Sequence, residues 1–397
     1  MANSSHSCDV FISGGGASGL VMAIALAAKN HEVVCCTGRI APVPPDWEDN
    51  RVTALLPSTT AYFKTLGLWD RLAPNALPLR GAMIAEMGRA DTLESPHADF
   101  MAEDFGFGDF GSIVQHKALL ACLRDHVNDL TNVRIITDTD TSGLVTRSGS
   151  ARVRLANADQ YETRLVIGAD GRNSTIRRLC AIGVSVRMSD QAALTFIVDH
   201  SHAHRGKTTE IHCREGPFTM IPMPGYSDRT SSVVWMATGQ SIRRLREMDR
   251  AALNAAATAR SSGVLGDLTV NSSLTAWPIM TQTAKRCQSE RVVLIAEAAH
   301  VMPPIGAQGF NTSVGDIAAL MRCLENADDP GAAEILNAYV RQRALPVLMR
   351  LQGVELLNRL SIARTPITRA LRQGALRTVG KSRPLQGLLV AAMGGHA

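Results

Sequence analysis

A glycine-rich turn close to the N-terminus constrains the fold of this chain more strongly than any other feature. The turn at 14–19 reads Gly-Gly-Gly-Ala-Ser-Gly and stands between a strand-like run at 9–13 and a helical run at 20–28, before a second strand-like run at 32–36. Glycines in such a turn let the backbone approach a pyrophosphate closely, and the start of the following helix attracts its negative charge. The order of strand, turn, helix and strand therefore predicts a parallel α/β sheet that binds a dinucleotide.

Two later segments have a similar form, in which a strand ends in a polar loop and leads toward a helix. The strand at 164–168 is followed by an Asp-Gly pair at 170–171, and the strand at 292–295 is followed by Glu297. After a loop rich in proline and glycine, a helical pattern covers 311–320. The free N–H groups and positive dipole end of this helix suit the electron-rich edge of a flavin ring. Three such loops imply one large cofactor lying across one sheet.

On these motifs the sequence resembles the flavoprotein aromatic hydroxylases of the para-hydroxybenzoate hydroxylase type over nearly its whole length, and more closely the UbiH/UbiF hydroxylases of ubiquinone biosynthesis. The segments at 49–55, 66–70 and 357–360 carry the likeness to the ubiquinone subgroup. The resemblance implies an α/β fold in which a Rossmann-like FAD-binding domain of the glutathione reductase type is interleaved with a β-sheet substrate domain and followed by a C-terminal helical segment. It also implies bound FAD, NAD(P)H as a transient reductant, and hydroxylation of a polyprenylated phenol or quinone precursor through a C4a-hydroperoxyflavin.

The same resemblance assigns cofactor contacts to particular residues. The expected FAD-binding residues are Gly14, Gly16, Gly19, Arg51, Gln115, His116, Asp170, Gly171, Glu297, Gly306, Ala307, Gln308, Gly309, Phe310 and Asn311. For Arg51 the alternative is a surface charge paired with Asp49, and one of Gln115 and His116 is expected to contact FAD. The resemblance implies that the flavin carries the chemistry, so no nucleophilic triad is required, and none is evident in the sequence. Pro304 and His300 are the candidates for a catalytic role, with structural support as the alternative for His300.

Four positions depart from the family pattern. Thr37 stands where the family usually has the acid that holds the adenosine ribose, and Ala296 and Glu297 replace a Gly-Asp pair. A glutamate can still accept a hydrogen bond from a ribityl hydroxyl. Ala307 replaces a glycine, which is expected to be tolerated only if its φ stays negative. These departures bear on affinity for FAD, and they keep open a non-catalytic scaffold subunit of a quinone-biosynthesis complex.

Strand-like runs outside the cofactor motifs predict a second sheet. They lie at 193–199, 219–224 and 231–236, with a helix expected over 241–259. The expected division is an FAD-binding domain of 7–77, 111–182 and 276–345, a substrate domain of 78–110 and 183–275, and a basic helical segment of 346–397. The residues expected to form a wall along a prenyl tail, with ordinary core packing as the alternative, are Phe218, Met220, Ile221, Met223 and Trp235.

The C-terminal part is strongly cationic and contains a leucine-rich helix predicted to begin at Pro346 and to stop before Pro366. This helix is interpreted either as a cap packed on the cofactor domain or as an interfacial helix that attracts anionic lipid. A membrane surface and other ubiquinone-biosynthesis proteins are therefore among the expected partners. Apolar runs are too short to span a membrane and no secretory segment is evident, so we expect a cytoplasmic location, peripheral on the inner membrane face.

The remaining composition argues against other classes of protein. A 4% aromatic content and the lack of a recognisable motif argue against nucleic-acid binding. The 8 cysteines show no CxxC pair, which favours free thiols over a zinc site or disulfides. Histidines at 200, 202 and 204 precede a hairpin-like loop, and no metal is expected. A hydroxylase of a small soluble phenol is the nearest enzymatic alternative.

Overall fold

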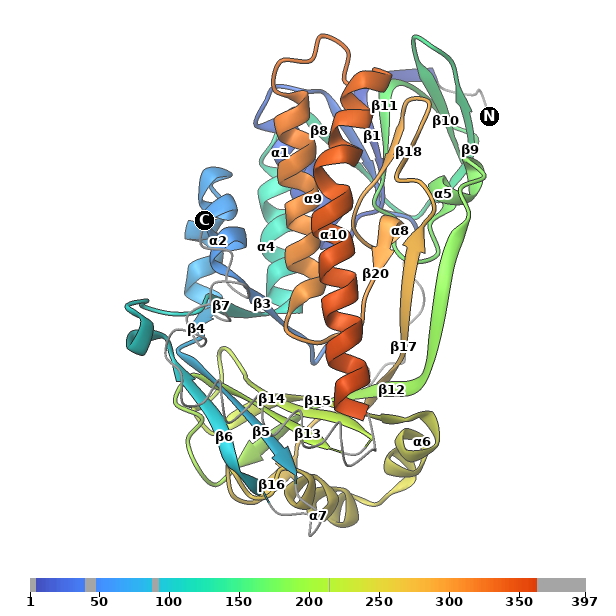
Figure 1. Cartoon of the computed structure of the whole chain (residues 1–397). Helices are drawn as coiled ribbons and strands as arrows, with labels where there is room; N and C mark the ends of the chain where they lie inside the picture. The colour runs from blue at the N-terminus through green and yellow to red at the C-terminus, as the bar shows by residue number, and fades with distance from the viewer. Residues whose placement is uncertain (1–4, 40–47, 88–92, 214, 363–397) are drawn as a thin grey trace.

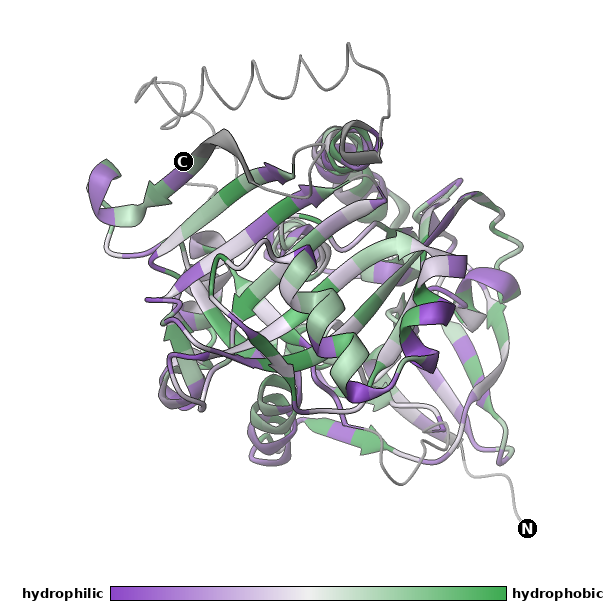
Figure 2. Ribbon diagram, turned by 90° about the horizontal axis from the view of Figure 1, so that it is seen from below, coloured by the Kyte–Doolittle hydropathy of each residue, from purple (hydrophilic) through white to green (hydrophobic). Residues whose placement is uncertain are grey.

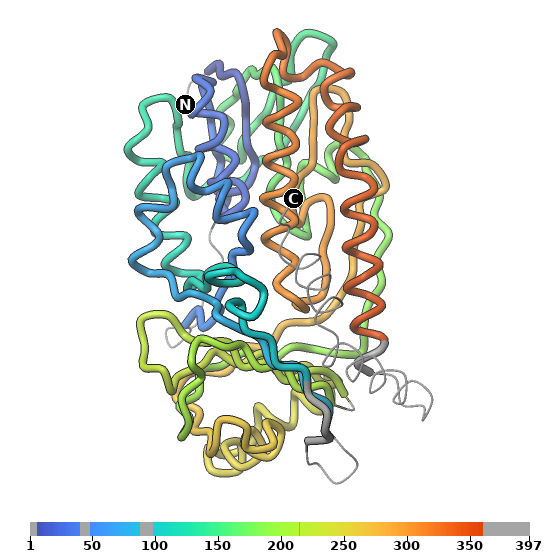
Figure 3. The backbone as a smooth tube through the Cα atoms, turned by 60° about the vertical axis from the view of Figure 1, so that its left-hand side comes forward, coloured from blue at the N-terminus to red at the C-terminus, as the bar shows by residue number. Residues whose placement is uncertain are grey.

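Two main sheets, joined by long strands, make up most of the molecule. The computed structural model describes residues 5–39, 48–87, 93–213 and 215–362. Figure 1 shows the first sheet behind a row of helices, with the second sheet below it. The long strands β12 (Val184–His200) and β17 (Thr275–Ala284) run along one side between the two layers. Figure 3 shows the same two layers from another side.

The first sheet is parallel at its centre, where its apolar strands are buried on both faces. β1 (Ser5–Ser13) lies between β2 (Val33–Cys36) and β11 (Gln160–Gly168), which are followed outward by β8 (Val133–Ile136) and β19 (Val292–Leu294). Antiparallel strands extend it: β9 (Thr141–Thr146), β10 (Ala151–Leu155) and β18 (Gln288–Ser289). The predicted α/β fold is thereby confirmed.

Three helices cover one face of the first sheet and build its main core. They are α1 (Ala17–Ala27), α4 (His116–Asn128) and α9 (Gln308–Leu324). Leu20, Leu119 and Leu320 from these helices are buried in one apolar cluster with the sheet. On the other face, the short helix α5 (Thr175–Leu179) and the hairpin of β9 and β10 enclose a second cluster. The three loops predicted to bind the cofactor therefore end at the same edge of one sheet.

The second sheet is largely antiparallel and carries two helices on its outer face. Its further strands are β5 (Gly81–Met87), β6 (Leu93–Met101), β13 (Lys207–Cys213), β14 (Gly216–Pro222), β15 (Thr230–Thr238), β16 (Leu268–Val270) and β20 (His300–Val301). Figure 2 views the molecule from the side of α6 (Gly239–Glu247) and α7 (Arg250–Arg260), which lie across this sheet. A small sheet of β3 (Val52–Leu55), β7 (Ser112–Gln115) and β4 (Ala76–Pro78) lies beside α2 (Pro57–Thr65) and α3 (Trp69–Leu72).

Several predicted boundaries differ from the structure. The single helix expected over 241–259 is two helices, because the Asp249 carboxylate accepts the N–H of Ala252 at 2.8 Å and caps the start of α7. The piece of FAD domain expected from 276 onward begins in the second sheet, since β17 pairs with β12 through Ala284. Pairing between strands far apart in sequence decided this boundary.

The last two helices start earlier than predicted. Helix α9 begins at Gln308, so the residues up to Asn311 form its first turn and not a loop. Helix α10 (Ala333–Ile362) contains Pro346 in its interior, so the prediction that a helix begins at this proline is wrong. Proline removes one backbone hydrogen bond from a helix, and Arg343 and Arg350 on either side of Pro346 form hydrogen bonds to α9. The remainder of the predicted basic segment, 363–397, lies outside the described residues.

Candidate functional site

Two glycines of the glycine-rich turn, Gly14 and Gly19, are packed too tightly to be replaced by residues with side chains. Gly14 has φ +122°, and a Cβ on it would lie 2.2 Å from the carbonyl oxygen of Ala169. A Cβ on Gly19 would lie 1.8 Å from the carbonyl oxygen of Gly14, whereas the space around Gly16 is open. Helix α1 starts at Ala17, within this turn, without a side-chain cap, so its first N–H groups are available to an anion. The turn thus offers a backbone cradle for a pyrophosphate.

Asp170 brings the second loop to the same place. Its Oδ2 accepts the N–H groups of Thr175 at 2.7 Å and Ile176 at 3.1 Å, which fixes the carboxylate against the start of α5. Its Oδ1 is buried and has no hydrogen-bond partner among the described residues. An acceptor left in this state is costly unless a ligand donates to it. The orphaned oxygen therefore fits a cofactor that carries hydroxyl groups.

The third loop connects β19 to α9 and is held by Asn311. The Asn311 side chain accepts the N–H of Leu56 at 2.9 Å and donates to the carbonyl oxygens of Ala54 at 2.8 Å and Ala307 at 2.6 Å. Ala307 has φ +57°, in the left-handed region, which overturns the expectation of a negative φ at this position. Such a conformation costs an alanine about 1 kcal/mol, and the Asn311 contacts hold it in place. Asn311 positions the loop and does not line the cavity beside it.

A cavity of about 560 Å³ lies where the three loops meet. The predicted residues that line it are Gly14, Gly16, Arg51, His116, Asp170, Gly171, Glu297, Gly309 and Phe310. The predicted residues that do not line it are Gly19, Gln115, Gly306, Ala307, Gln308 and Asn311. Because the open glycines, the orphaned carboxylate oxygen and the uncapped helix starts converge here, the residues present fit FAD.

One end of this cavity carries a neutral histidine and a paired arginine. Burial, followed by the charge of Arg51, lowers the pKa of His116 to about 4. Gln115 instead donates to the carbonyl oxygen of Pro224 at 2.6 Å, so of these two neighbours only His116 lines the cavity. Both guanidinium contacts of Arg51 with Asp49 measure 2.7 Å, and Arg51 also lies over the ring of Trp277. Arg51 therefore lines the cavity and is also paired with Asp49.

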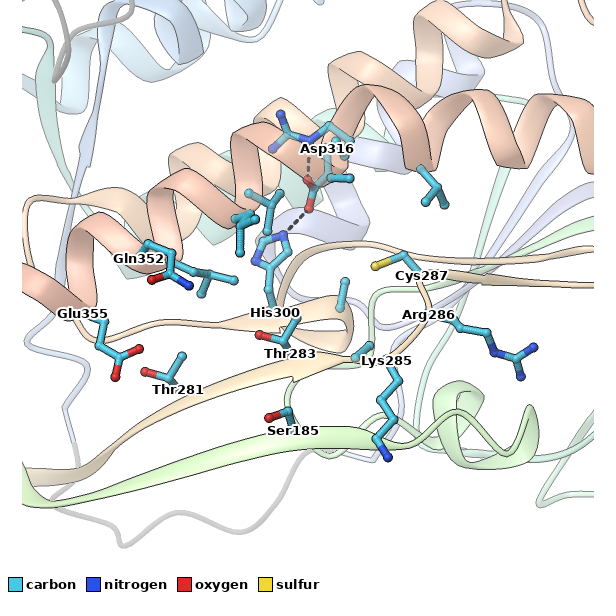
Figure 4. Close-up of a pocket in the computed structure, with 18 of the residues that line it drawn as sticks. Ser185, Thr281, Thr283, Lys285, Arg286, Cys287, His300, Asp316, Gln352 and Glu355 are labelled. Carbon is cyan, nitrogen blue, oxygen red and sulfur yellow. Dashed lines mark hydrogen bonds and ion pairs between the residues drawn. The ribbon is translucent and has the colours of Figure 1, made fainter.

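His300 occupies a buried ion-pair network behind the third loop. Its Nε2 lies 2.7 Å from Asp316 Oδ2, and Arg343 Nε donates to the other oxygen of Asp316 at 2.7 Å (Figure 4). Burial raises the pKa of Asp316, but the charges and hydrogen bonds of His300 and Arg343 outweigh this and keep the pKa below its usual value. The N–H of Ala296, which has φ +54°, also donates to Asp316. Pro304, the other catalytic candidate, is exposed and does not line the cavity.

A second cavity, of about 870 Å³, lies on the other side of His300 between α10 and the strands β12 and β17 (Figure 4). Its apolar wall comes from α10 and includes Val347, Leu348 and Leu351. Lys285 and Arg286 stand at its edge with exposed side chains. His300 lines both cavities, so this groove and the cofactor cavity meet at one side chain.

The predicted substrate wall is only partly supported by the second sheet. Phe218, Met220 and Trp235 are buried in a cluster with α6 and α7, on the outer face, which favours ordinary core packing, the alternative given for these residues. Ile221 alternates with them on β14 and is half-buried. A different cluster, which includes Met236 and Ile305, joins the sheet to the third loop. Both faces of these strands are apolar, and the sequence pattern alone therefore did not distinguish them.

Several cavity residues have no counterpart in the predicted set. They are Ser13, Gly15, Ala17, Ser18, Cys36, Thr37, Gly38, Arg39, Asp140, Thr141, Ala169, Thr175, Ala296, Val301, Met302 and Ser313, and His300, a candidate for a catalytic role, also lines the cavity. Most of them lie next to predicted residues in the three loops. The exceptions are residues 36–39 at the end of β2 and residues 140–141, which come after β8 and have no motif around them. Among the described residues, no group of three His, Cys, Asp or Glu side chains is arranged to hold a metal ion.

Comparison with known proteins agrees with this geometry. Residues 7–351 match the family model described as FAD binding domain. Ubiquinone hydroxylase UbiL of Rhodospirillum rubrum is 29% identical over 385 residues, which cover 95% of this chain and 88% of that protein. 3-Demethoxyubiquinol 3-hydroxylase of Escherichia coli is 26% identical over 88% of each chain. The solved structure of p-nitrophenol 4-monooxygenase PnpA from Pseudomonas putida shares the fold, with a TM-score of 0.80 at 17% identity over 99% of this chain and 100% of that chain.

Proposed function

The chain belongs to the FAD-binding-domain family, and from this premise we propose that it is an FAD-dependent monooxygenase that hydroxylates the aromatic ring of a polyprenylated phenol in ubiquinone biosynthesis. The observation that carries this proposal is the convergence of three separate loops on one cavity that fits FAD. The two relatives described above bear the names of ubiquinone-pathway hydroxylases and align over most of their length.

Each part of the cavity has a task toward FAD in this proposal. The glycine turn and the start of α1 hold the pyrophosphate, Asp170 Oδ1 accepts a hydroxyl hydrogen, and the first N–H groups of α9 stabilise negative charge at the ring edge. Bound FAD supplies the activation of oxygen and its transfer to an electron-rich ring. His116 stays neutral near pH 7 because its pKa is about 4, which leaves Arg51 as the cation at that end of the cavity. Electrons come from NAD(P)H that binds transiently, since the sequence has no second glycine-rich fingerprint.

We assign the prenyl tail of the substrate to the groove between α10 and strands β12 and β17. The groove has an apolar wall, and it meets the cofactor cavity at His300, so a tail lying in it would have its ring end near the third loop. On the opposite wall, polar groups come from Thr281 and Thr283 of β17 and from Ser185 and Arg187 of β12 (Figure 4). Burial of a long apolar tail gains about 0.8 kcal/mol for each CH₂ group, which favours lipid substrates over small phenols.

We further propose that α10 touches the inner face of the membrane, from which a lipid substrate enters the groove. Leu345, Met349 and Leu356 are exposed and lie within one face of the helix. The exposed cations Arg341, Lys285 and Arg286 lie on the helix and at the groove edge, where they would attract anionic headgroups. Of the helices in the described residues, none has both the length and the apolar content needed to cross a bilayer.

The first experiment is an absorbance spectrum of the purified protein with and without added FAD, followed by NADH or NADPH in the presence or absence of a short-chain prenylphenol. We expect a bound-flavin spectrum that bleaches faster when the prenylphenol is present, and a product that has gained one oxygen atom by mass spectrometry. Equal stimulation by a small soluble phenol would favour the alternative substrate class. Lack of FAD uptake at high FAD concentration would contradict the enzyme and favour a non-catalytic scaffold.

A further inference from the structure

The end of β2 lacks the acid that dinucleotide-binding folds place there. In such folds a carboxylate about 20 residues after the glycine turn accepts hydrogen bonds from the adenosine ribose. In this chain β2 ends at Cys36 and is followed by Thr37 and Gly38. Thr37 lies directly against the turn, since a Cβ on Gly15 would be 2.4 Å from the Thr37 Cγ2. A threonine hydroxyl is a weaker acceptor than a carboxylate, so the ribose side of the cavity needs another anion.

Asp140 brings a carboxylate to this place from a different strand. β8 pairs with β2 in parallel, and the N–H of Thr37 donates to the carbonyl oxygen of Ile136 at 2.8 Å. The chain then continues beyond the end of both strands to Asp140, whose Oδ1 accepts the N–H of Arg39 at 3.0 Å. A Cβ on Gly38 would lie 3.1 Å from the same oxygen. The side chain therefore stands beside the residues that follow β2.

The Asp140 carboxylate also has room to bind a ligand. It lines the cofactor cavity together with the glycine turn, and it lines an adjoining depression with Thr175 and Arg178. Its Oδ2 is 3.8 Å from Arg39 Nε, beyond a good hydrogen bond, so this oxygen keeps lone pairs for hydroxyl donors. The position, charge and free acceptor capacity together match those of the missing acid.

We propose that Asp140 replaces the strand-end acid and binds the ribose hydroxyls of the FAD adenosine. The proposal rests on FAD as the cofactor of the proposed function. It accounts for how the chain keeps an anion at the ribose although Thr37 stands at the usual position. The usual acid follows β2, whereas Asp140 follows β8. Both positions lie at the same site because the parallel pairing of β2 and β8 places the C-terminal ends of these strands side by side.

The test is the affinity of the full-length apoprotein for FAD, measured by quenching of flavin fluorescence, in the wild type and in Asp140→Asn. Loss of a charge-assisted hydrogen bond weakens binding by about 10-fold or more. The affinity for FMN, which has no adenosine, is expected to stay unchanged. Thr37→Glu in the Asp140→Asn background should restore much of the FAD affinity, because it returns a carboxylate to the end of β2.

Two controls make the result specific. Asp138→Asn changes a neighbouring exposed aspartate that does not line the cavity, at a φ of +59° that asparagine tolerates, and should bind FAD like the wild type. An FAD analogue with a deoxyribose in its adenosine should lose less affinity on Asp140→Asn than FAD does. Wild-type FAD affinity in Asp140→Asn, or an equal loss of FMN affinity, would overturn the proposal. A wild-type protein that binds FMN and FAD equally would also overturn it, whereas a protein that binds neither flavin would contradict the proposed function itself.

Discussion

At the scale of single residues, Asp316 of α9 is a buried carboxylate that contacts three separate groups. It is 1% exposed and accepts from His300, Arg343 and the N–H of Ala296. These contacts tie the wall between the two cavities to α10. Removing one partner of a buried ion pair leaves a buried charge without compensation. The free-energy cost of that charge is larger than the stabilisation that the intact pair provides.

We expect Asp316→Asn to lower the free energy of unfolding at pH 7 by about 3 kcal/mol. The folded-state pKa of Asp316 is below the value of 3.8 expected for an unfolded aspartate. Its contribution is therefore full above that value and is lost as the pH falls through the folded pKa. Thermal unfolding of both proteins between pH 7 and pH 3 should show the difference shrinking as the pH falls. Asp125→Asn, an exposed change on α4, is the control, and a difference that grows on acidification would contradict this account.

At the scale of elements, α10 is a component of the site as well as a cover for the first sheet. Arg343 contacts Asp316, and Arg350 donates to the side chain of Gln308 at 3.1 Å in the first turn of α9. Arg343 also lines the groove, next to the apolar wall that Val347, Leu348 and Leu351 of the same helix form. A helix that touches the third loop and the groove at once can align a tail with the reacting ring.

Leu348→Glu tests the groove as the tail site. Leu348 lines the groove and is 52% exposed, so a charge there should leave the fold intact while opposing an apolar tail. We expect KM for a long-tailed prenylphenol to rise about 5-fold or more in a detergent-solubilised assay, with KM for a short-chain analogue unchanged. Leu357→Glu, at a similarly exposed position outside the groove, is the matched control. An equal effect on both substrates would remove the groove from the proposal.

At the scale of the whole molecule, the exposed apolar face of α10 adjoins the mouth of the groove and its cations. This arrangement predicts binding to anionic lipid that depends on both apolar contact and charge. Full-length protein should float with vesicles containing phosphatidylglycerol, less so with pure phosphatidylcholine vesicles or at high salt. The double change Leu345→Glu and Met349→Glu should reduce flotation several-fold without altering the affinity for FAD. Undiminished flotation of this variant would show that the face does not contact lipid.

The sequence by itself determined the cofactor and the class of fold. Strands, glycine turns and helix starts are local features, because backbone conformation and periodic burial are set by neighbouring residues. The residues at 14–19, 170–171 and 297–311 therefore predicted three loops of one cavity, although the positive φ of Ala307 escaped prediction.

Only the tertiary structure decided which side chains meet. It selected His116 over Gln115, joined His300 to Asp316 and Arg343, and brought Asp140 beside Gly38 through the pairing of β8 with β2. It also placed Phe218 in the core between the second sheet and the helices α6 and α7, a choice of face that depends on packing between distant segments. Contacts between residues distant in the chain depend on register and packing, which local patterns do not encode.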